Sequence, residues 1–82
     1  MADKYWMYIL RTNKDTLYTG VTNNLIKRLE KHRTGKGSKY VRSFESFEIV
    51  YKEEFETRSE AMTREYEIKQ WTKAKKEELI LV

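Results

Sequence analysis

The chain has 82 residues, a net charge of +4 and no cysteine, so disulfide bonds, zinc–thiolate sites and thiol nucleophiles are excluded. Its length predicts a single domain over residues 1–82 with a small core, and the lack of an apolar leader or of a bilayer-length segment predicts a soluble, cytoplasmic protein. The basic balance favours an acidic partner such as nucleic acid, although it is equally compatible with charge that serves only solubility.

The first predicted elements form a β-hairpin. The apolar run 6–10 (Trp-Met-Tyr-Ile-Leu) is rich in aromatic and branched side chains, which indicates a strand covered on both faces and placed at the centre of a sheet. Residues 13–16 (Asn-Lys-Asp-Thr) supply turn chemistry, and residues 17–21 follow at once. We therefore expect two antiparallel strands joined by a short turn.

A helix is predicted over residues 24–33, with Thr22 or Asn23 as its N-terminal cap. Its apolar residues recur at helical spacing on one face: Leu25, Ile26 and Leu29. Residues 34–43 are basic and contain two glycines without sustained periodicity. This segment predicts a loop, with room for one helical turn around Tyr40.

A third strand is predicted over residues 47–55, where apolar and polar residues alternate. The apolar members are Phe47, Ile49, Tyr51 and Phe55. Thr57 and Glu60 have the spacing of a capping box, so a helix should begin there and run to about Trp71.

A last short helix is expected over residues 73–81, docked through its final apolar residues 79–81. The predicted order is strand, strand, helix, strand, helix, helix. This order defines an α+β domain with a small three-stranded antiparallel sheet flanked by helices.

One carboxylate lies where an apolar side chain is expected. At about 100° per residue, four residues define the apolar arc of the helix that follows the third strand: Ala61, Met62, Tyr66 and Ile68. Glu65 falls in the middle of this arc. A buried carboxylate should be paired, hydrogen-bonded or bound to a metal. A salt bridge with Lys69 or with a lysine of the sheet accounts for it as well as a functional role does.

The first helix carries a cationic edge. Arg28 and His32 lie four residues apart beside the apolar stripe, with Lys31 next to them. We expect them to face one cleft, where cationic groups can bind phosphate oxygens or stabilise charge in phosphoryl transfer. A histidine near a helix C-terminus is more commonly a dipole partner or a surface residue.

Tyr8 and Tyr18 lie on the two strands of the hairpin. Most strand tyrosines only pack. A phenol beside a cationic edge and a metal-binding carboxylate could nevertheless act as a general base, because nearby positive charge lowers its pKa. Residues 35–39 could hold a phosphate through backbone amides, but their glycine spacing is not that of a Walker loop.

Together these residues resemble the GIY-YIG nuclease superfamily over most of the chain. Residues 6–8 (Trp-Met-Tyr) stand at its first motif, 18–20 (Tyr-Thr-Gly) at its second, and 23–32 look like its arginine-containing helix. Residues 64–66 match the region of its metal-binding glutamate. The sequence departs from both motifs but keeps the tyrosines and Gly20. In these departures it resembles a short single-domain bacterial branch of the superfamily that is largely uncharacterised.

The resemblance implies that the chain is an endonuclease that hydrolyses phosphodiester bonds in DNA. Tyr8 and Tyr18 would organise the attacking water, and one of them would accept its proton. Arg28 would stabilise the pentacovalent phosphate. Glu65 would hold a single divalent cation, Mg²⁺ or Mn²⁺, that keeps several water ligands. His32 is a further catalytic candidate.

The resemblance also implies a substrate recognised by structure more than by sequence, such as branched or damaged DNA. A homodimer or a protein partner would compensate for the lack of room for a separate DNA-binding domain. The residues expected to contact nucleic acid are basic: Lys27, Lys31, Lys36, Lys39 and Arg42. Two alternatives stay open: a nucleic-acid-binding or DNA-repair accessory module without turnover, and a structural interaction domain in which Glu65 has an ordinary ion-pair partner.

Overall fold

The computed structural model describes residues 4–33 and 47–82. The elements in chain order are β1 (Tyr5–Thr12), β2 (Leu17–Thr22), α1 (Leu25–Arg33), β3 (Phe47–Phe55), α2 (Arg58–Lys69) and α3 (Lys73–Ile80). This order confirms the predicted α+β fold. The predicted loop 34–43, with its helical turn, lies outside the described residues.

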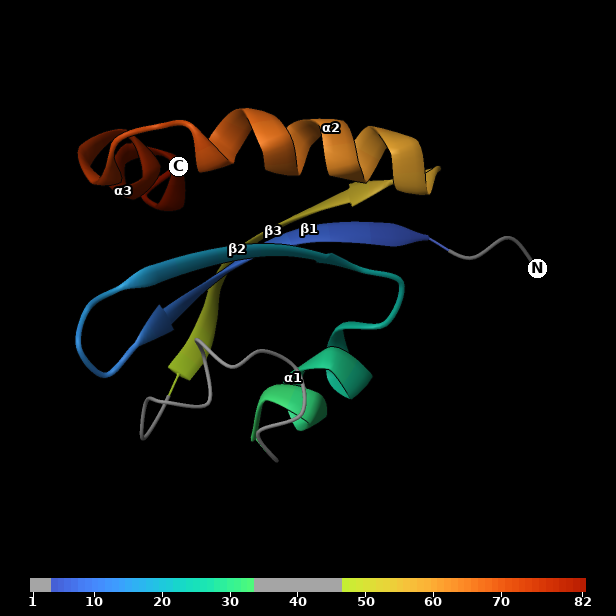
Figure 1. Cartoon of the computed structure of the whole chain (residues 1–82), viewed down its shortest axis with the longest axis horizontal. Coiled ribbons are helices and arrows are strands. Elements are labelled where there is room, and N and C mark those ends of the chain that lie inside the picture. The colour runs from blue at the N-terminus through green and yellow to red at the C-terminus, as the bar shows by residue number, and fades with distance from the viewer. Residues whose placement is uncertain (1–3, 34–46) are drawn as a thin grey trace.

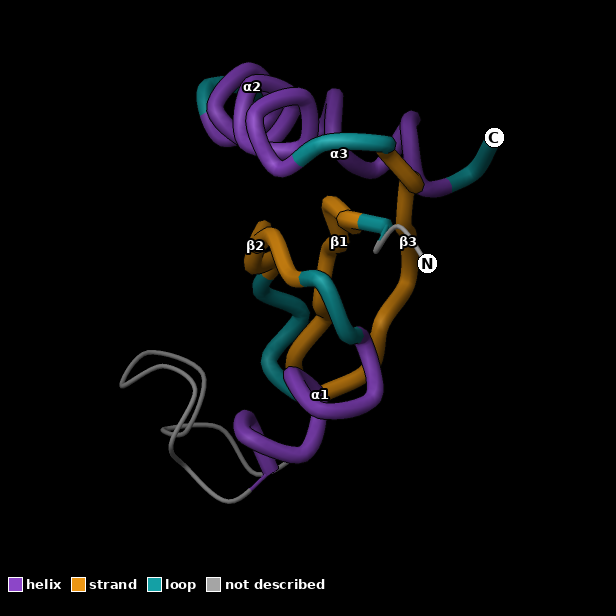
Figure 2. The backbone as a smooth tube through the Cα atoms, turned by 90° about the vertical axis from the view of Figure 1, so that its right-hand side faces the viewer, coloured by secondary structure: helices purple, strands orange, loops and turns teal. Residues whose placement is uncertain are grey.

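The three strands form one antiparallel sheet in the order β2-β1-β3, so the apolar strand is central as predicted. Helices α2 and α3 lie over one face of the sheet and α1 lies over the other (Figure 1; Figure 2). A strand covered on both faces must be apolar on both faces. This requirement explains the unbroken apolar run at its centre.

Alternate residues of β1 supply two separate cores. Met7 and Ile9 pack with Ile68 of α2, while Tyr8 and Leu10 pack on the opposite face beneath α1. Each of these β1 side chains is at most 1% exposed. The α1-side core contains Tyr8, so a residue predicted to take part in the site is also a packing residue.

The third strand differs from its predicted alternation. The register of β1 with β3 shifts between Ile9, which pairs with Tyr51, and Leu10, which pairs with Ile49. The extra residue at this bulge is Val50. A bulge reverses the faces to which the flanking side chains point. Ile49 therefore enters the core beneath α1, whereas Tyr51 packs on the α2 side.

Helix α2 docks through a narrower stripe than the sequence predicts. Its predicted capping box is confirmed, and Ala61 and Ile68 are fully buried. Between them, Arg64 donates to both carboxylate oxygens of Glu53 on β3, at 3.0 and 3.1 Å. The prediction is wrong for Met62 and Tyr66, which are 46% and 71% exposed, because the face held by Arg64 turns both of them off the sheet.

Three details of α1 and α3 also differ from the prediction. The N-cap of α1 is Asn24, whose side-chain oxygen accepts from the Lys27 amide at 3.0 Å, so neither residue proposed for this role holds it. Ile26 is 78% exposed instead of packing with its neighbours. In α3, Leu79 and Ile80 pack against the α2-side core, but Leu81 is 86% exposed because the helix has ended before it.

We predict that Ile68→Ala lowers the free energy of unfolding by about 2–5 kcal/mol, because it leaves a cavity in the α2-side core. Met62→Ala is the matched control on the same helix and should change it by no more than about 0.5 kcal/mol. Urea unfolding followed by circular dichroism measures both. Equal losses in the two variants would show that α2 docks through the face predicted from the sequence.

Candidate active site

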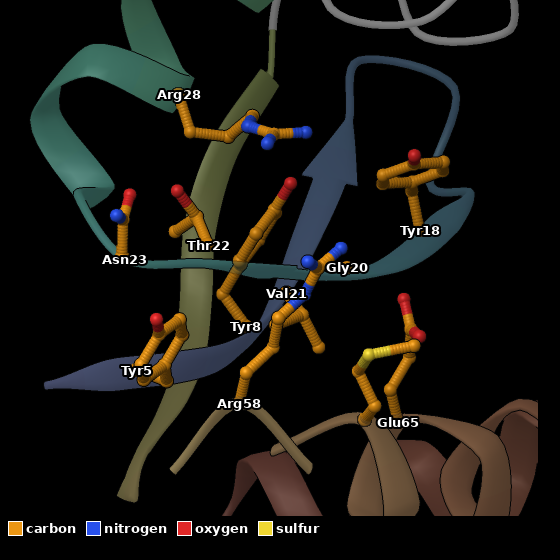
Figure 3. A pocket seen from close by; sticks show the side chains of 11 residues that line it. Tyr5, Tyr8, Tyr18, Gly20, Val21, Thr22, Asn23, Arg28, Arg58 and Glu65 are labelled. Carbon is orange, nitrogen blue, oxygen red and sulfur yellow. The ribbon is translucent and has the colours of Figure 1, made fainter. Parts of the chain in front are cut away.

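A cavity of about 410 Å³ lies around the edge strand β2, where β1, β2 and the starts of α1 and α2 meet. Figure 3 shows side chains from all these elements around it. They are Tyr5, Tyr8, Tyr18, Gly20, Val21, Thr22, Asn23, Arg28, Arg58, Met62 and Glu65. The cavity thus brings together three phenols, two guanidinium groups and one carboxylate that are scattered over the sequence.

Gly20 makes room for the phenol of Tyr8. The two residues are paired across β1 and β2, and a Cβ atom at position 20 would lie 2.5 Å from the Tyr8 hydroxyl oxygen and 2.7 Å from Cζ. No side chain tolerates such contacts without displacing the ring. Glycine is therefore required here by the close approach of Tyr8.

His32 lies behind Tyr8 and does not line the cavity. Its Nε2 is 3.2 Å from the Tyr8 hydroxyl oxygen, and only 2% of the residue is exposed. The rings of Tyr18 and Phe47 meet its imidazole edge-on, with centroids 5.7 and 5.8 Å away. His32 is thus linked to the cavity indirectly, by its contacts with Tyr8 and Tyr18, which line it.

Burial governs the titration of the Tyr8–His32 pair. It raises the pKa of the Tyr8 phenol well above its ordinary value, and the Arg28 cation opposes this shift without overcoming it. The predicted lowering of this pKa by positive charge is present as the effect of Arg28, but burial outweighs it, so the pKa of Tyr8 is raised overall. Burial also lowers the pKa of His32, and Arg28 adds to that effect.

The tautomer of His32 follows from its surroundings. Within residues 4–33 and 47–82, its buried Nδ1 has no hydrogen-bond partner. A buried N–H group without an acceptor is costlier and rarer than an unprotonated ring nitrogen without a donor. We therefore infer that the neutral imidazole carries its proton on Nε2 and donates to the Tyr8 oxygen, which leaves the Tyr8 hydroxyl hydrogen free to point into the cavity.

Glu65 lies at the border of the docked face of α2, and not in the middle of a buried arc as predicted. Its side chain is 21% exposed, and Lys69 Nζ lies 3.4 Å from its Oε2. The expected pairing with Lys69 therefore exists. Lys69 is 53% exposed, however, and such an open pair stabilises by only about 0–1 kcal/mol. A stronger ligand for the carboxylate can displace the lysine.

The donor set around Glu65 fits a hard divalent cation that keeps most of its water. No group of three acidic, histidine or cysteine side chains that could enclose a metal occurs in the described part of the chain. Mg²⁺ typically binds through one or two carboxylates together with waters and substrate phosphates. One carboxylate at the wall of an open cavity supplies this arrangement, and Glu65 would be the residue that holds the ion.

Arg58 lines the cavity but was not among the residues predicted from the sequence. Figure 3 shows its side chain reaching from the start of α2 toward the strands. The available signal was its spacing: seven residues, or two helical turns, separate it from Glu65, so both lie on the same side of α2. Tyr5, Val21, Thr22, Asn23 and Met62 also line the cavity without having been predicted.

Of the basic residues predicted to contact nucleic acid, the two that the structure describes, Lys27 and Lys31, do not line the cavity. Lys27 and Lys31 lie on α1 and are exposed. Lys36, Lys39 and Arg42, like the phosphate-binding segment 35–39, lie outside the described residues. None of the helices in the described part of the chain has the length and apolarity to cross a bilayer.

Comparison with known proteins gives matches over nearly the whole chain. The family model of the GIY-YIG catalytic domain matches residues 4–78. A UPF0213 protein of Oceanobacillus iheyensis is 49% identical over 80 residues, which cover 98% of this chain and 93% of the relative. Another, of Natronomonas pharaonis, is 44% identical over 80 residues, covering 98% and 94%. The solution NMR structure of a UPF0213 protein from Bacillus halodurans matches with a TM-score of 0.61 at 39% identity, over 94% of this chain and 82% of that one.

These matches agree with the observed fold. The chain belongs to the GIY-YIG family. The relatives named above are UPF0213 proteins, a small single-domain group within that family. Membership points to nuclease chemistry in general.

We predict that the stability of the protein falls as the pH is lowered from about 6.5 toward 5. The folded state lowers the pKa of His32 below its ordinary value of 6.5, so within this window the unfolded chain binds the additional proton. The stabilisation is complete above the unfolded pKa and is lost as the pH falls through the folded pKa. Carboxylates with a lowered pKa, such as Glu53, make the stability depend on pH only below about pH 4.5.

Urea unfolding of the wild type and of His32→Gln between pH 5 and 8 measures this effect. The variant should lack the decline between pH 6.5 and 5. Because the chain has one histidine, its imidazole resonances give the folded pKa directly. Titration at or above 6.5, or parallel declines in both proteins, would contradict the burial of a neutral imidazole.

Proposed function

We propose that the chain is a single-domain, divalent-metal-dependent endonuclease that hydrolyses phosphodiester bonds in DNA. One observation carries the proposal: Glu65, Arg28, Tyr8 and Tyr18 line the same cavity although they come from four different elements. Phosphodiester hydrolysis needs a cationic group on the phosphate, a site for a metal and polar groups that orient water. The cavity supplies each of these from a separate element.

Arg28 is the proposed phosphate ligand. Its guanidinium comes from α1, on the opposite face of the sheet from the helix that carries Glu65 (Figure 3). A planar guanidinium can donate two hydrogen bonds to the oxygens of a phosphate and offset the charge that develops there. Arg28 and Glu65 would thus hold the scissile group from two sides.

Tyr8 and Tyr18 have different proposed roles. The ordinary pKa of a tyrosine, 10.0, already keeps Tyr8 protonated near neutral pH, and burial raises this pKa further, so Tyr8 donates a hydrogen bond into the cavity and does not begin as a base. His32 positions that hydroxyl from behind, through the 3.2 Å contact of Nε2 with the phenol oxygen. Tyr18, which is only partly buried, is the phenol that contacts and orients the attacking water.

Glu65 is the proposed ligand of one Mg²⁺ or Mn²⁺ ion. When bound, the ion would supply Lewis-acid stabilisation of the phosphate charge. The exposed pair of Glu65 with Lys69 is weak enough to be replaced. Glu65→Gln should therefore cost less than about 1 kcal/mol of stability, whereas a buried structural pair would cost about 3–5 kcal/mol.

The substrate is proposed to be branched or damaged DNA, recognised by structure with weak sequence specificity. The net charge of +4 supports attraction to a polyanion that weakens as salt rises. The basic residues of α1, Lys27 and Lys31, would contact phosphates outside the cavity. A homodimer or a protein partner would extend this small contact surface.

Cleavage of labelled duplex, single-stranded, flap and branched DNAs in Mg²⁺ or Mn²⁺ tests the proposal. We predict that wild type nicks at least one of them and that chelation abolishes the activity. Glu65→Gln and Arg28→Ala should each lower kcat at least about 100-fold, because each removes a group that stabilises charge on the phosphate.

Glu78→Gln, on the exposed side of α3, is the matched control and should leave the rate unchanged. Thermal melts establish that each variant is folded. If Glu65→Gln cuts as fast as the wild type, the hydrolytic site is elsewhere. If the wild type binds the DNAs with salt-sensitive affinity but cuts none of them, the chain is a binding module without turnover.

A further inference from the structure

An exposed apolar surface continues from the cavity along α2. It is a shallow hollow lined by Arg58, Ser59, Met62, Thr63 and Tyr66, which we call the α2 shelf. Arg58 and Met62 line both the cavity and the shelf. The two hollows are therefore adjacent, and a strand that leaves the cavity beside these two residues passes over the shelf.

The shelf combines three chemical features along one side of a helix. Arg58, Met62 and Tyr66 are spaced by four residues, so they form a single row that borders Glu65. Within the described residues no carboxylate pairs with Arg58, while Arg64, further along the same helix, has two acidic partners. Tyr66 is 71% exposed and Met62 46% exposed, although neither is needed to fill a core.

The charge and the apolar surface match one repeating unit of a nucleic acid strand. An arginine without a carboxylate partner suits a phosphate, and an exposed phenol with a thioether beside it suits the flat face of a base. The order along the row also fits, because the cation lies beside the cavity and the aromatic ring lies two turns further along the helix.

We propose that the α2 shelf is a nucleotide subsite that binds the nucleotide next to the scissile phosphate. Arg58 contacts its phosphate, and its base stacks on Tyr66 against Met62. This inference rests on the proposed function, since it takes the cavity as the place of the scissile group. A base on the shelf cannot remain in a duplex stack, so the subsite selects strands with an unpaired base at that position.

Fluorescence anisotropy with single-stranded DNA probes of about ten nucleotides tests the subsite. The protein used is the Glu65→Gln variant in Mg²⁺, so that the measurement of binding does not depend on hydrolysis of the probe. In each probe of the series an abasic residue replaces a different nucleotide, one position at a time. An abasic residue at one particular position should weaken binding about 10-fold. Adding Tyr66→Ala should weaken the intact probe similarly and remove the sensitivity to that position.

Arg58→Ala, in the same background, should weaken all probes and lower the magnitude of the salt slope by about 1, because one phosphate contact is lost. The matched controls are Ile26→Ala, which removes an exposed apolar residue of α1 outside the shelf, and Lys14→Ala, which removes an exposed cation of the β1–β2 turn. Neither should change the positional pattern.

The outcomes separate the subsite from the hydrolytic site. Positional coupling to Tyr66 in a protein whose wild type cuts no DNA keeps the subsite and rejects the nuclease. Cleavage that depends on Glu65, without any coupled position, keeps the nuclease and overturns the subsite. Loss of coupling in Ile26→Ala, or a dimer that dissociates on Tyr66→Ala, also overturns it, because the shelf would then be a general surface or a subunit contact.

Discussion

The docking of α2 on the sheet is the constraint on which the site depends. Burial of Ile68 stabilises the fold by about 1.5–3 kcal/mol, and the partly exposed pair of Arg64 with Glu53 adds at most about 1 kcal/mol. Burial therefore holds the helix down, while the bidentate geometry of the ion pair selects its rotation. With that rotation fixed, Glu65 follows at the edge of the docked face and borders the cavity. The orientation of the Glu65 carboxylate thus follows from the docking of the helix alone.

The central strand imposes the second constraint. Because β1 is covered on both faces, its alternate residues must serve two cores, and Tyr8 enters the core beneath α1 as a packing residue. Its phenol reaches the cavity only because Gly20, its partner on β2, has no side chain that would collide with the ring. The same burial that places the hydroxyl also raises its pKa. A group fixed in this way is well suited to donate a hydrogen bond and poorly suited to lose its proton.

The element order and the convergence of the two tyrosines, Arg28 and Glu65 could be predicted because strong local patterns and the family motifs carry them. Which face of α2 packs on the sheet could not be predicted, because Met62 and Tyr66 are apolar and yet exposed. Periodicity locates apolar residues but does not say whether they meet a core or a ligand. The bulge at Val50 could not be predicted, because one apolar residue at a polar position of an alternating strand does not by itself indicate a bulge. The pKa of Tyr8 depends on depth, which sequence spacing does not give.

Titration of Mn²⁺ into the protein, followed by the paramagnetic broadening of backbone amide resonances, tests the central claim most directly. If Glu65 holds the cation in the cavity, the amides of Glu65 and of facing residues such as Gly20 should broaden first. The effect should disappear in Glu65→Gln and persist in Glu78→Gln. Broadening that is centred elsewhere, or that survives in Glu65→Gln, would contradict the account.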